Sequence, residues 1–299
     1  MKRLGLSICL IALLLPTASF AKVQLPVLKN GAPAYPRQAD EFASAIVIDV
    51  TSGKELYVFH PDEVRSAASL TKLMGALVYL DTKPKLTKIV TLKKADEVGG
   101  GRLRVNDGAT MSVQDMLYSS IVGSANNCAT ALARLSGLGL KTFVARMNAK
   151  ARALKLSSAA HFADPAGMDP KNVLTVRDEA KIATAAFANP LLRQIASTSV
   201  YSFKVRNTGE VHTIKNTNHL LTMDPNMYVL AGKTGYLEEA QYNFDVKLRN
   251  TDAGSREDLL VIVLGSPTEP RVFASGKALA EWAWKAYSWP SVRESLAKP

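Results

Sequence analysis

Runs of β-branched and aromatic residues mark both ends of the chain, and helical spacing fills its middle. Residues 44–50 (SAIVIDV) and 55–59 (ELYVF) are two such runs, separated by the polar segment 51–54 with its glycine. This arrangement predicts a β-hairpin. After residue 199 the pattern again predicts strands, at 200–205, 228–235, 241–248 and 259–264.

Between about residues 67 and 198, helix-start signals and helical spacing replace the strand pattern. Ser112 and Thr175 each stand three residues before an aspartate, as in a capping box, and so predict helix starts. Asn126 or Asn127 is expected to cap a third helix. One apolar helical face is formed by Phe143, Met147, Ala151 and Leu154.

Strands at both ends and helices between them favour an α+β fold over an alternating α/β fold. The simplest arrangement is one antiparallel sheet built from both termini, with an all-helical subdomain inserted into it. We expect the sheet subdomain at about 38–66 and 199–290, including a final helix at about 271–287. The helical subdomain is expected at about 67–198.

The first residues resemble a targeting segment. Lys2 and Arg3 precede an apolar run at 4–15, and small residues lead up to Ala21. This predicts a signal peptide at 1–21, cleaved after Ala21. An uncleaved anchor is the alternative, although the run is short for a membrane span. The remaining residues, 22–299, are expected to be exported, with no strong membrane anchor of their own.

The chain of 299 residues has a net charge of +11, which falls to +9 without Lys2 and Arg3. Outside the cytoplasm a basic surface suits an anionic polymer such as cell wall, and an ordinary basic protein is the alternative. The basic residues are not interleaved with aromatic ones, which argues against nucleic acid as a partner.

Cysteine and histidine usage excludes other kinds of site. Cys9 lies in the predicted signal peptide, so Cys128 is left without a partner for an internal disulfide and is expected to be a buried, structural thiol. The four histidines show no spacing typical of a metal site. We therefore predict neither a metal nor a cofactor.

The segment Ser69-Leu70-Thr71-Lys72 stands at a predicted helix start. Residues three apart share a helix face, so Lys72 can reach the Ser69 hydroxyl. The free amides at a helix start also favour negative charge there. Taken alone, Ser69 is equally explained as a helix cap, and Ser-x-x-Lys also occurs at 19–22 and 295–298.

Two further polar motifs follow. Ser124-Ala125-Asn126 lies on a predicted turn between helices, where both polar side chains can point into a cleft. Lys233-Thr234-Gly235 follows the strand that begins at 228, and its glycine lets a ligand backbone approach. Each motif alone also fits ordinary turn or strand-end chemistry.

Together, in this order and spacing, the three motifs resemble those of low-molecular-mass penicillin-binding proteins, the serine-type D-alanyl-D-alanine peptidases of peptidoglycan. The similarity covers about residues 38–287. It extends to Asn148-Ala149-Lys150-Ala151, Phe162-Ala163-Asp164-Pro165-Ala166-Gly167, Arg177-Asp178 and Asn216-Thr217-Asn218-His219-Leu220. The resemblance implies a β-lactamase/transpeptidase-like fold.

The resemblance also implies the catalytic roles. Ser69 would attack the carbonyl carbon of a D-alanine and form an acyl-enzyme. Lys72, as a neutral amine, would be the general base; burial and the nearby charge of Lys233 would lower its pKa. Ser124 would pass the proton to the leaving nitrogen.

The remaining site residues would bind substrate, again by resemblance. Asn126 would hold a substrate amide, and Lys233 with Thr234 would bind the terminal carboxylate beside Gly235. The backbone amides of Ser69 and Tyr236 would form the oxyanion hole.

Two positions depart from the pattern of the family. Gln241 replaces a residue that is commonly glycine, and Tyr236 replaces a residue that is commonly smaller. Both are expected to change the shape of the cleft wall.

The activity implied is hydrolysis of D-alanyl bonds in peptidoglycan stem peptides, in the periplasm or cell-wall space, with β-lactams as covalent inhibitors. The compact chain resembles the short D-alanyl-D-alanine endopeptidases more than the longer carboxypeptidases, so cleavage of cross-links is favoured. Carboxypeptidase activity is the alternative, followed by a serine β-lactamase and a silent wall-binding module.

A β-lactamase needs an additional carboxylate that activates water for deacylation. The acidic residues in the corresponding region are Asp164, Asp169, Asp178 and Glu179. Glu179 is expected to stabilise the start of its own helix instead, which argues against rapid deacylation.

Overall fold

The computed structural model describes residues 24–252 and 257–289, so the predicted signal peptide lies outside the described residues. The strands are β1 (Val27–Leu28), β2 (Ser44–Asp49), β3 (Glu55–Phe59), β4 (Arg65–Ser66), β5 (Ile89–Thr91), β6 (Thr110–Ser112), β7 (Val173–Leu174), β8 (Val200–Lys204), β9 (Val211–Lys215), β10 (Tyr228–Leu237), β11 (Gln241–Arg249), β12 (Asp258–Ser266) and β13 (Tyr287–Ser288).

Most helices lie in the middle of the chain, and one long helix precedes the last strand. They are the 3₁₀ helices η1 (Ala68–Leu70) and η2 (Lys94–Asp96), and the α-helices α1 (Thr71–Asp81), α2 (Val113–Ile121), α3 (Asn126–Leu135), α4 (Leu140–Ala153), α5 (Val176–Ala188), α6 (Pro190–Ala196), α7 (His219–Met223) and α8 (Glu269–Ala286).

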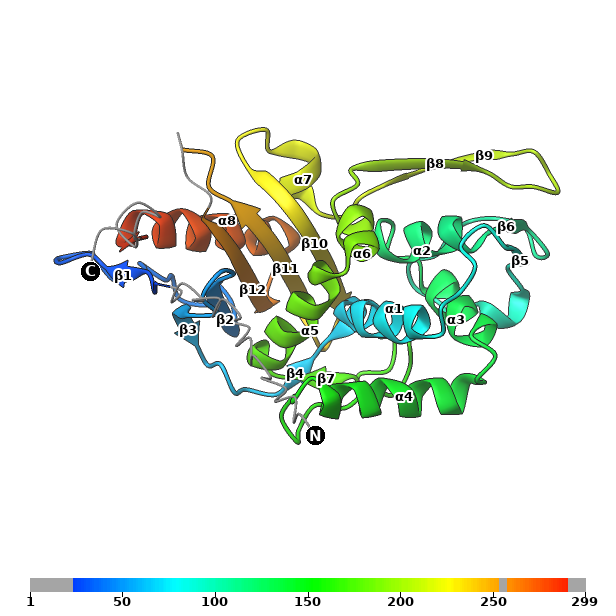
Figure 1. Ribbon diagram of the computed structural model, residues 1–299, viewed down its shortest axis with the longest axis horizontal. Helices are drawn as coiled ribbons and strands as arrows, with labels where there is room; N and C mark the ends of the chain where they lie inside the picture. The colour runs from blue at the N-terminus through cyan, green and yellow to red at the C-terminus, as the bar shows by residue number, and fades with distance from the viewer. Residues whose placement is uncertain (1–23, 253–256, 290–299) are drawn as a thin grey trace, which may run out of the picture.

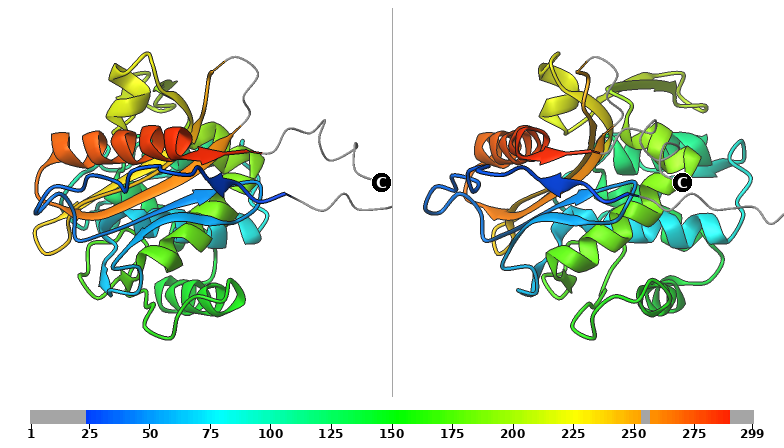
Figure 2. Two further views of the ribbon diagram at one scale, coloured as in Figure 1. Left: turned by 90° about the vertical axis from the view of Figure 1, so that its left-hand side faces the viewer. Right: turned by 60° about the vertical axis from the view of Figure 1, so that its left-hand side comes forward.

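A five-stranded antiparallel sheet combines both ends of the chain, in the order β10-β11-β12-β2-β3. Helix α8 covers one face and α5 the other (Figures 1 and 2). Residues 259–264 of the central strand β12 are all apolar because their side chains alternate between two cores. Leu260 and Ile262 join the core on the α5 side, whereas Leu259 and Val261 join the core under α8. The α+β class and the sheet built from both termini are thus confirmed.

Helix α1 runs through the middle of the helical part, surrounded by α2, α3, α4 and α5 (Figure 1). Every residue from Thr71 to Tyr79 is buried. A helix surrounded on all sides has no solvent-facing side, which explains why residues 73–80 of α1 carry no charged side chain. The inserted segment is mainly helical but not all-helical: it contains the short ribbon β5–β6, and its strand β7 pairs with β4 just before the segment.

The local signals for helix starts were mostly correct. The capping boxes at Ser112 and Thr175 are both formed, and α2 and α5 begin directly after them. The predicted cap of α3 is wrong, because Ala125 occupies the cap position and neither asparagine side chain caps the helix. Asn126 and Asn127 instead form hydrogen bonds to distant segments.

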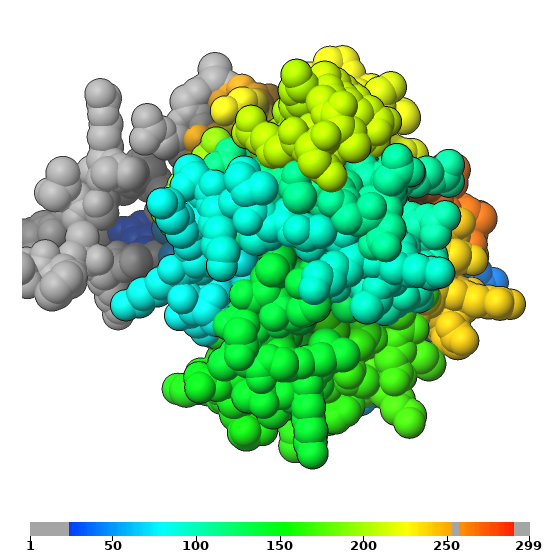
Figure 3. Space-filling model, turned by 90° about the vertical axis from the view of Figure 1, so that its right-hand side faces the viewer, coloured from blue at the N-terminus to red at the C-terminus, as the bar shows by residue number. Residues whose placement is uncertain are grey.

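The prediction that residues 200–205 join the main sheet is wrong. Strand β8 pairs only with β9, in a separate hairpin that projects along the helical side of the molecule (Figures 1 and 3). The hairpin is anchored by Tyr201, whose ring stacks on Tyr118 and whose hydroxyl donates to Asp115 at 2.6 Å. Most of its other side chains are exposed or half-buried, so the hairpin lacks the apolar face that would hold a strand in the sheet.

No helix within residues 24–252 and 257–289 combines the length and apolar character needed to cross a membrane. Cys128 is fully buried on α3, and burial raises the pKa of its thiol. This agrees with the expectation of a structural thiol.

Candidate active site

A cavity of about 440 Å³ opens where the edge strand β10 meets the start of α1. Segments from three distant parts of the chain line it: the residues before α1, the loop before α3, and β10. All three motifs identified in the sequence therefore reach one cavity. The predicted site residues that line it are Ser69, Ser124, Asn126, Thr234, Gly235 and Tyr236.

Ser69 stands on a bent segment just before α1. The preceding Ala68 has a left-handed φ of 47°, which is uncommon for a residue with a side chain. Lys72 follows one helical turn later on the same face, and its Nζ lies 2.7 Å from Ser69 Oγ. The hydroxyl and the amine are therefore in direct hydrogen-bond contact.

The Lys72 amine has two other partners, and both are acceptors. Its Nζ donates to Asn126 Oδ1 at 2.7 Å and to the Ala166 carbonyl oxygen at 2.6 Å. A neutral amine has two N–H groups and one lone pair. Because the two acceptors use both N–H groups, the lone pair is left to accept a hydrogen bond from the Ser69 hydroxyl.

The surroundings of Lys72 favour this neutral form. Burial lowers the pKa of Lys72 well below its ordinary value of 10.5, and the positive charge of Lys233 lowers it further. Asp164 acts in the opposite direction with a smaller effect. The cost of placing an ammonium group in a buried site thus outweighs the attraction of the nearby carboxylate.

Ser124 faces the second buried lysine. Its backbone is left-handed, with a φ of 55°, and Lys233 Nζ donates to Ser124 Oγ and to the Thr234 carbonyl oxygen, each at 2.8 Å. Burial lowers the pKa of Lys233 to about 8, while Asp245 and Glu179 act to raise it. Near neutral pH Lys233 is therefore mainly an ammonium group beside Ser124.

Asn126 connects Lys72 to the glycine-rich loop at 99–101. Its Nδ2 donates to the Gly99 carbonyl oxygen and to Met168 Sδ, each at 2.9 Å, and its backbone N–H donates to the Gly101 carbonyl oxygen. Gly100 and Gly101 line the cavity. The glycine-rich loop at 99–101 therefore borders the cavity.

Gly235 brings β10 against the backbone that holds Ser69. A Cβ atom at position 235 would lie 3.2 Å from the Ser69 nitrogen and 3.1 Å from the Ala67 carbonyl oxygen, so this approach favours a residue without a side chain. The following Tyr236 is 54% exposed, and its ring lies against Tyr242 with centroids 4.5 Å apart. The two rings form part of the outer wall of the cavity.

The expectation that Gln241 reshapes the cleft wall is wrong. Gln241 is exposed at the β10–β11 turn, pairs with Leu237, and does not line the cavity. Its φ of 56° is left-handed, which explains why glycine suits this position. The departure from the family pattern therefore affects the turn and leaves the cleft unchanged.

The sequence reasoning missed two supports of the site. Thr217 Oγ1 lies 2.6 Å from Thr234 Oγ1, which fixes the hydroxyl of the third motif. Asn243 Nδ2 donates to the Ser66 carbonyl oxygen at 2.9 Å, and its Oδ1 accepts from Gly265 N–H at 2.9 Å. Thr217 and Asn243 lie on segments that only the tertiary fold brings near the cavity. The family similarity at residues 216–220 could have indicated Thr217.

Asp164 is a third support, and it holds the loop whose carbonyl accepts from Lys72. Its two carboxylate oxygens accept hydrogen bonds at 2.6–2.8 Å from the backbone N–H groups of Ala166, Gly167 and Asp169 and from Asn172 Nδ2. A carboxylate with this many donors is fixed as a loop anchor. The pattern Asp-Pro-Ala-Gly is a turn signal that could have indicated this role.

The expectation that Glu179 stabilises the start of α5 is also wrong. Its side chain is completely buried and faces Asp245 on β11, with Lys233 nearby. The capping role at this helix start belongs to Thr175 and Asp178.

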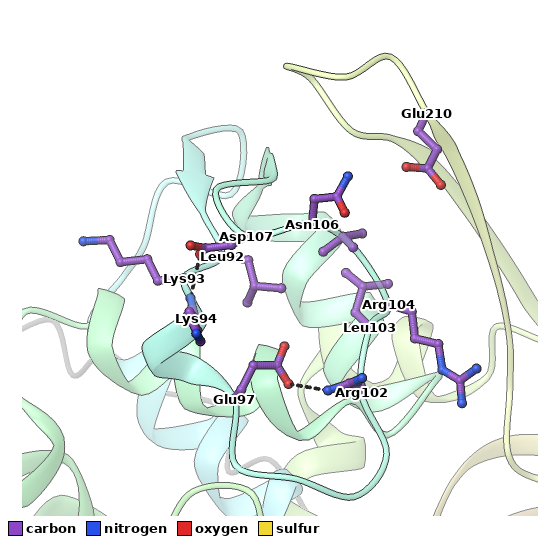
Figure 4. Close-up of a pocket in the computed structure, with 11 residues that line it drawn as sticks. Leu92, Lys93, Lys94, Glu97, Arg102, Leu103, Arg104, Asn106, Asp107 and Glu210 are labelled. Carbon is purple, nitrogen blue, oxygen red and sulfur yellow. Dashed lines mark hydrogen bonds and ion pairs between the residues drawn. The ribbon is translucent and has the colours of Figure 1, made fainter.

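A second hollow, of about 500 Å³, lies between residues 92–107 and the start of β9 (Figure 4). Figure 4 shows Glu97 and Arg102 pointing toward each other, 3.6 Å apart, and Glu210 on the hairpin opposite. Charged side chains of both signs line this hollow, and none of the motif residues reaches it. The motif chemistry is therefore confined to the cavity at Ser69.

Comparison with known proteins identifies similar chains. The model of the D-alanyl-D-alanine carboxypeptidase family matches residues 33–268. A D-alanyl-D-alanine endopeptidase of Pseudomonas aeruginosa is 34% identical over 260 residues, which cover 86% of this chain and 81% of the relative. A D-alanyl-D-alanine endopeptidase of Escherichia coli is 35% identical over 199 residues, which cover 66% of this chain and 64% of the relative.

Solved structures agree with these matches. The Streptomyces K15 DD-transpeptidase superimposes with a TM-score of 0.77 at 27% sequence identity, covering 85% of this chain and all of that one. The β-lactamase/transpeptidase-like architecture expected from the sequence is thereby confirmed.

Proposed function

The chain belongs to the D-alanyl-D-alanine carboxypeptidase family of serine peptidases, and on this premise we propose that it hydrolyses D-alanyl bonds of peptidoglycan stem peptides through an acyl-enzyme on Ser69. The observation that carries the proposal is the contact of 2.7 Å between Lys72 Nζ and Ser69 Oγ. Since the other two partners of the amine are acceptors, its lone pair is available for the serine proton.

The reaction begins when the Ser69 oxygen attacks the carbonyl carbon of the D-alanyl bond and its proton passes to Lys72 Nζ. The tetrahedral oxyanion is stabilised by the backbone N–H groups of Ser69 and Tyr236. The C–N bond then breaks, and the proton held by Lys72 passes through the Ser124 hydroxyl to the leaving amine, which returns Lys72 to its neutral form. Water, deprotonated by Lys72, hydrolyses the ester and restores the free serine.

Substrate binding uses the opposite wall of the cavity. Lys233 and Thr234 bind the carboxylate of the substrate, as an ammonium group and a hydroxyl fixed by Thr217. Asn126 pairs with a substrate amide, and Gly235 allows the substrate backbone to lie along β10. The basic character of the chain suits such an anionic substrate.

Cleavage of cross-links is the preferred reaction, because the relatives from Pseudomonas aeruginosa and Escherichia coli are both endopeptidases by name. Carboxypeptidase activity is the second candidate, favoured by the name of the family model. Export to the periplasm or cell-wall space and covalent inhibition by β-lactams belong to the same proposal.

A β-lactamase is disfavoured by the surroundings of the acidic residues. Rapid deacylation needs a carboxylate that can activate water. Asp164 is occupied by backbone donors, and Glu179 is buried against Asp245. Neither is free to act as that base, so the acyl-enzyme formed with penicillin is expected to be long-lived.

Digestion of purified muropeptides tests the proposed function. We expect the protein to convert cross-linked dimers into monomers, measured by chromatography and mass spectrometry. The variant Ser69→Ala should neither cleave dimers nor release the terminal D-alanine of pentapeptides. If only the terminal D-alanine of pentapeptide monomers is released while dimers stay intact, the protein is a carboxypeptidase. Full activity in Ser69→Ala would refute the acyl-enzyme.

The two lysines predict a bell-shaped pH dependence for acylation by a fluorescent penicillin. On the acid side the rate falls as pH drops through the pKa of Lys72, because the base must be neutral. On the alkaline side it falls as pH rises through about 8, where Lys233 loses the charge that binds the carboxylate. The measurement is the second-order rate constant between about pH 5 and about pH 10.

The matched variant for this prediction is Lys233→Arg. A guanidinium group stays protonated over the whole range, so the variant should lose the alkaline decline even if its larger side chain lowers the rate overall. A wild-type rate that keeps rising to about pH 10 would contradict the assigned role of Lys233.

A further inference from the structure

Two carboxyl groups lie side by side in the core directly behind Lys233. Asp245 on β11 is the antiparallel cross-strand partner of Lys233 on β10, so both side chains emerge on the same face of the sheet. Helix α5 packs on that face and contributes Glu179 (Figure 1). The side chains of Glu179 and Asp245 are fully buried, and Lys233 is 1% exposed.

The two carboxyl groups, called here the carboxyl pair, have no donors if both are ionised. Within the described residues, none of their four oxygens has a hydrogen-bond partner. The backbone N–H of Lys233 lies near Asp245 without reaching hydrogen-bond geometry. The two groups are, however, within hydrogen-bonding reach of each other.

A single proton resolves this conflict. Two carboxylates in contact cannot both stay ionised in a dry core, since burial and mutual repulsion both disfavour the second charge. When one group is protonated, its O–H donates to the other carboxylate, and the carboxyl pair keeps one negative charge. That charge then stands opposite the ammonium group of Lys233.

The charges around the carboxyl pair agree with one shared proton. Burial raises the pKa of Glu179 well above its ordinary range, followed by repulsion from Asp245 and Asp178. Burial also raises the pKa of Asp245, against the attraction of Lys233. The positive charge of Lys233 also acts to lower the pKa of Glu179. Neither carboxyl group of the pair is among the causes of the pKa shift of Lys72, on which Lys233 does act.

We propose that Glu179 and Asp245 share one proton and act as positioning residues, whose single negative charge keeps Lys233 in the ammonium form that binds the substrate carboxylate and donates to Ser124. The proposal rests on the proposed function for the role of Lys233. Neither carboxyl group lines the cavity, so both act through Lys233 and never touch the substrate.

The test compares pH profiles of penicillin acylation in four proteins: the wild type, a double variant and two single-substitution controls. The double variant Glu179→Gln/Asp245→Asn replaces the carboxyl pair by two amides of the same shape, which can still bond to each other but carry no charge. We expect the acylation rate of the double variant to decline at a pH at least about one unit lower than that of the wild type. At pH values above the midpoints of both declines, the variant should therefore react about tenfold more slowly than the wild type. The acid side should stay in place.

The single variant Glu179→Gln is the matched control. It leaves Asp245 as a carboxylate beside Lys233 and supplies an amide N–H as its donor, so the charge is retained and the alkaline decline should coincide with that of the wild type. Asp49→Asn, another buried aspartate on the same sheet but on β2, controls for loss of a buried carboxyl group. It should leave both sides of the profile unchanged.

Infrared spectroscopy tests the proton directly. At neutral pH the C=O stretch of a protonated carboxylic acid should be present in the spectrum of the wild type. The spectrum of the double variant should lack this band. If the amide pair prevents folding, Glu179→Met/Asp245→Val removes the same charge with apolar side chains of similar size, a replacement that buried ionic groups often tolerate.

The outcomes separate the two proposals. If the wild type is not acylated at all, the proposed function fails before the carboxyl pair is tested. If the wild type shows the alkaline decline and the double variant shows it at the same pH, the carboxyl pair is only structural and the inference is overturned. A shift in Glu179→Gln as large as in the double variant would also refute the shared proton.

Discussion

Replacing Lys72 with methionine is expected to slow acylation of Ser69 by penicillin about 10⁴-fold, the upper end of what a general base contributes. Methionine keeps the length of the side chain but removes the lone pair that accepts the serine proton. It also leaves Asn126 Oδ1 and the Ala166 carbonyl oxygen without their donor. Intact-mass spectrometry over time measures the loss, since the wild type should accumulate a penicilloyl adduct.

An exposed lysine provides the control for this substitution. Lys141→Met on α4 removes the same chemical group from the surface and should be acylated at the wild-type rate. Thermal unfolding must show that Lys72→Met is folded at the assay temperature. If the folded variant is acylated within about tenfold of the wild type, Lys72 is not the base and the role passes to Ser124.

Replacing Gly167 with alanine is expected to destabilise the protein by about 2–5 kcal/mol. The φ of Gly167 is 78°, which costs a residue with a side chain about 1–2 kcal/mol. The new Cβ would also lie 1.9 Å from the Ala68 carbonyl oxygen, so one of two backbone segments must move, at about 1–3 kcal/mol. The midpoint of thermal unfolding should fall by roughly 10 °C.

The same substitution should slow acylation, because Ala68 directly precedes Ser69, the proposed nucleophile. Gly53→Ala separates the two causes of destabilisation. Gly53 has a similar φ of 72° in the β2–β3 turn, but a Cβ there meets no atom within 4 Å. It should lose only about 1–2 kcal/mol and keep its acylation rate. Equal losses in the two variants would show that the contact with Ala68 is unimportant.

Local interactions explain which parts of the fold could be predicted from the sequence. The β2–β3 hairpin and the capping boxes at Ser112 and Thr175 involve residues only a few positions apart. Their geometry is set by backbone conformation and short-range hydrogen bonds, so a sequence pattern specifies them. The contact between Ser69 and Lys72 belongs to the same class, because one helical turn separates the two residues.

Predictions were wrong where a residue could interact either with a local partner or with one far away in the sequence. Asn126 can cap a helix locally, yet in the fold it accepts from Lys72, 54 positions away. Residues 200–204 have strand-forming composition, yet they pair with β9 because the hairpin docks on α2 through Tyr201. In both cases a long-range contact overrides a local preference.

The amino-acid sequence by itself determined the fold class, the order of the elements and the three motifs, because periodicity and short spacings are written into the chain. Only the tertiary structure decided that Lys233 reaches Ser124 across 109 positions, that Asp164 is a loop anchor, and that Glu179 meets Asp245. The physical reason is burial: a lysine or a carboxyl group takes its charge and pKa from the groups that replace water around it, and those come from distant parts of the chain.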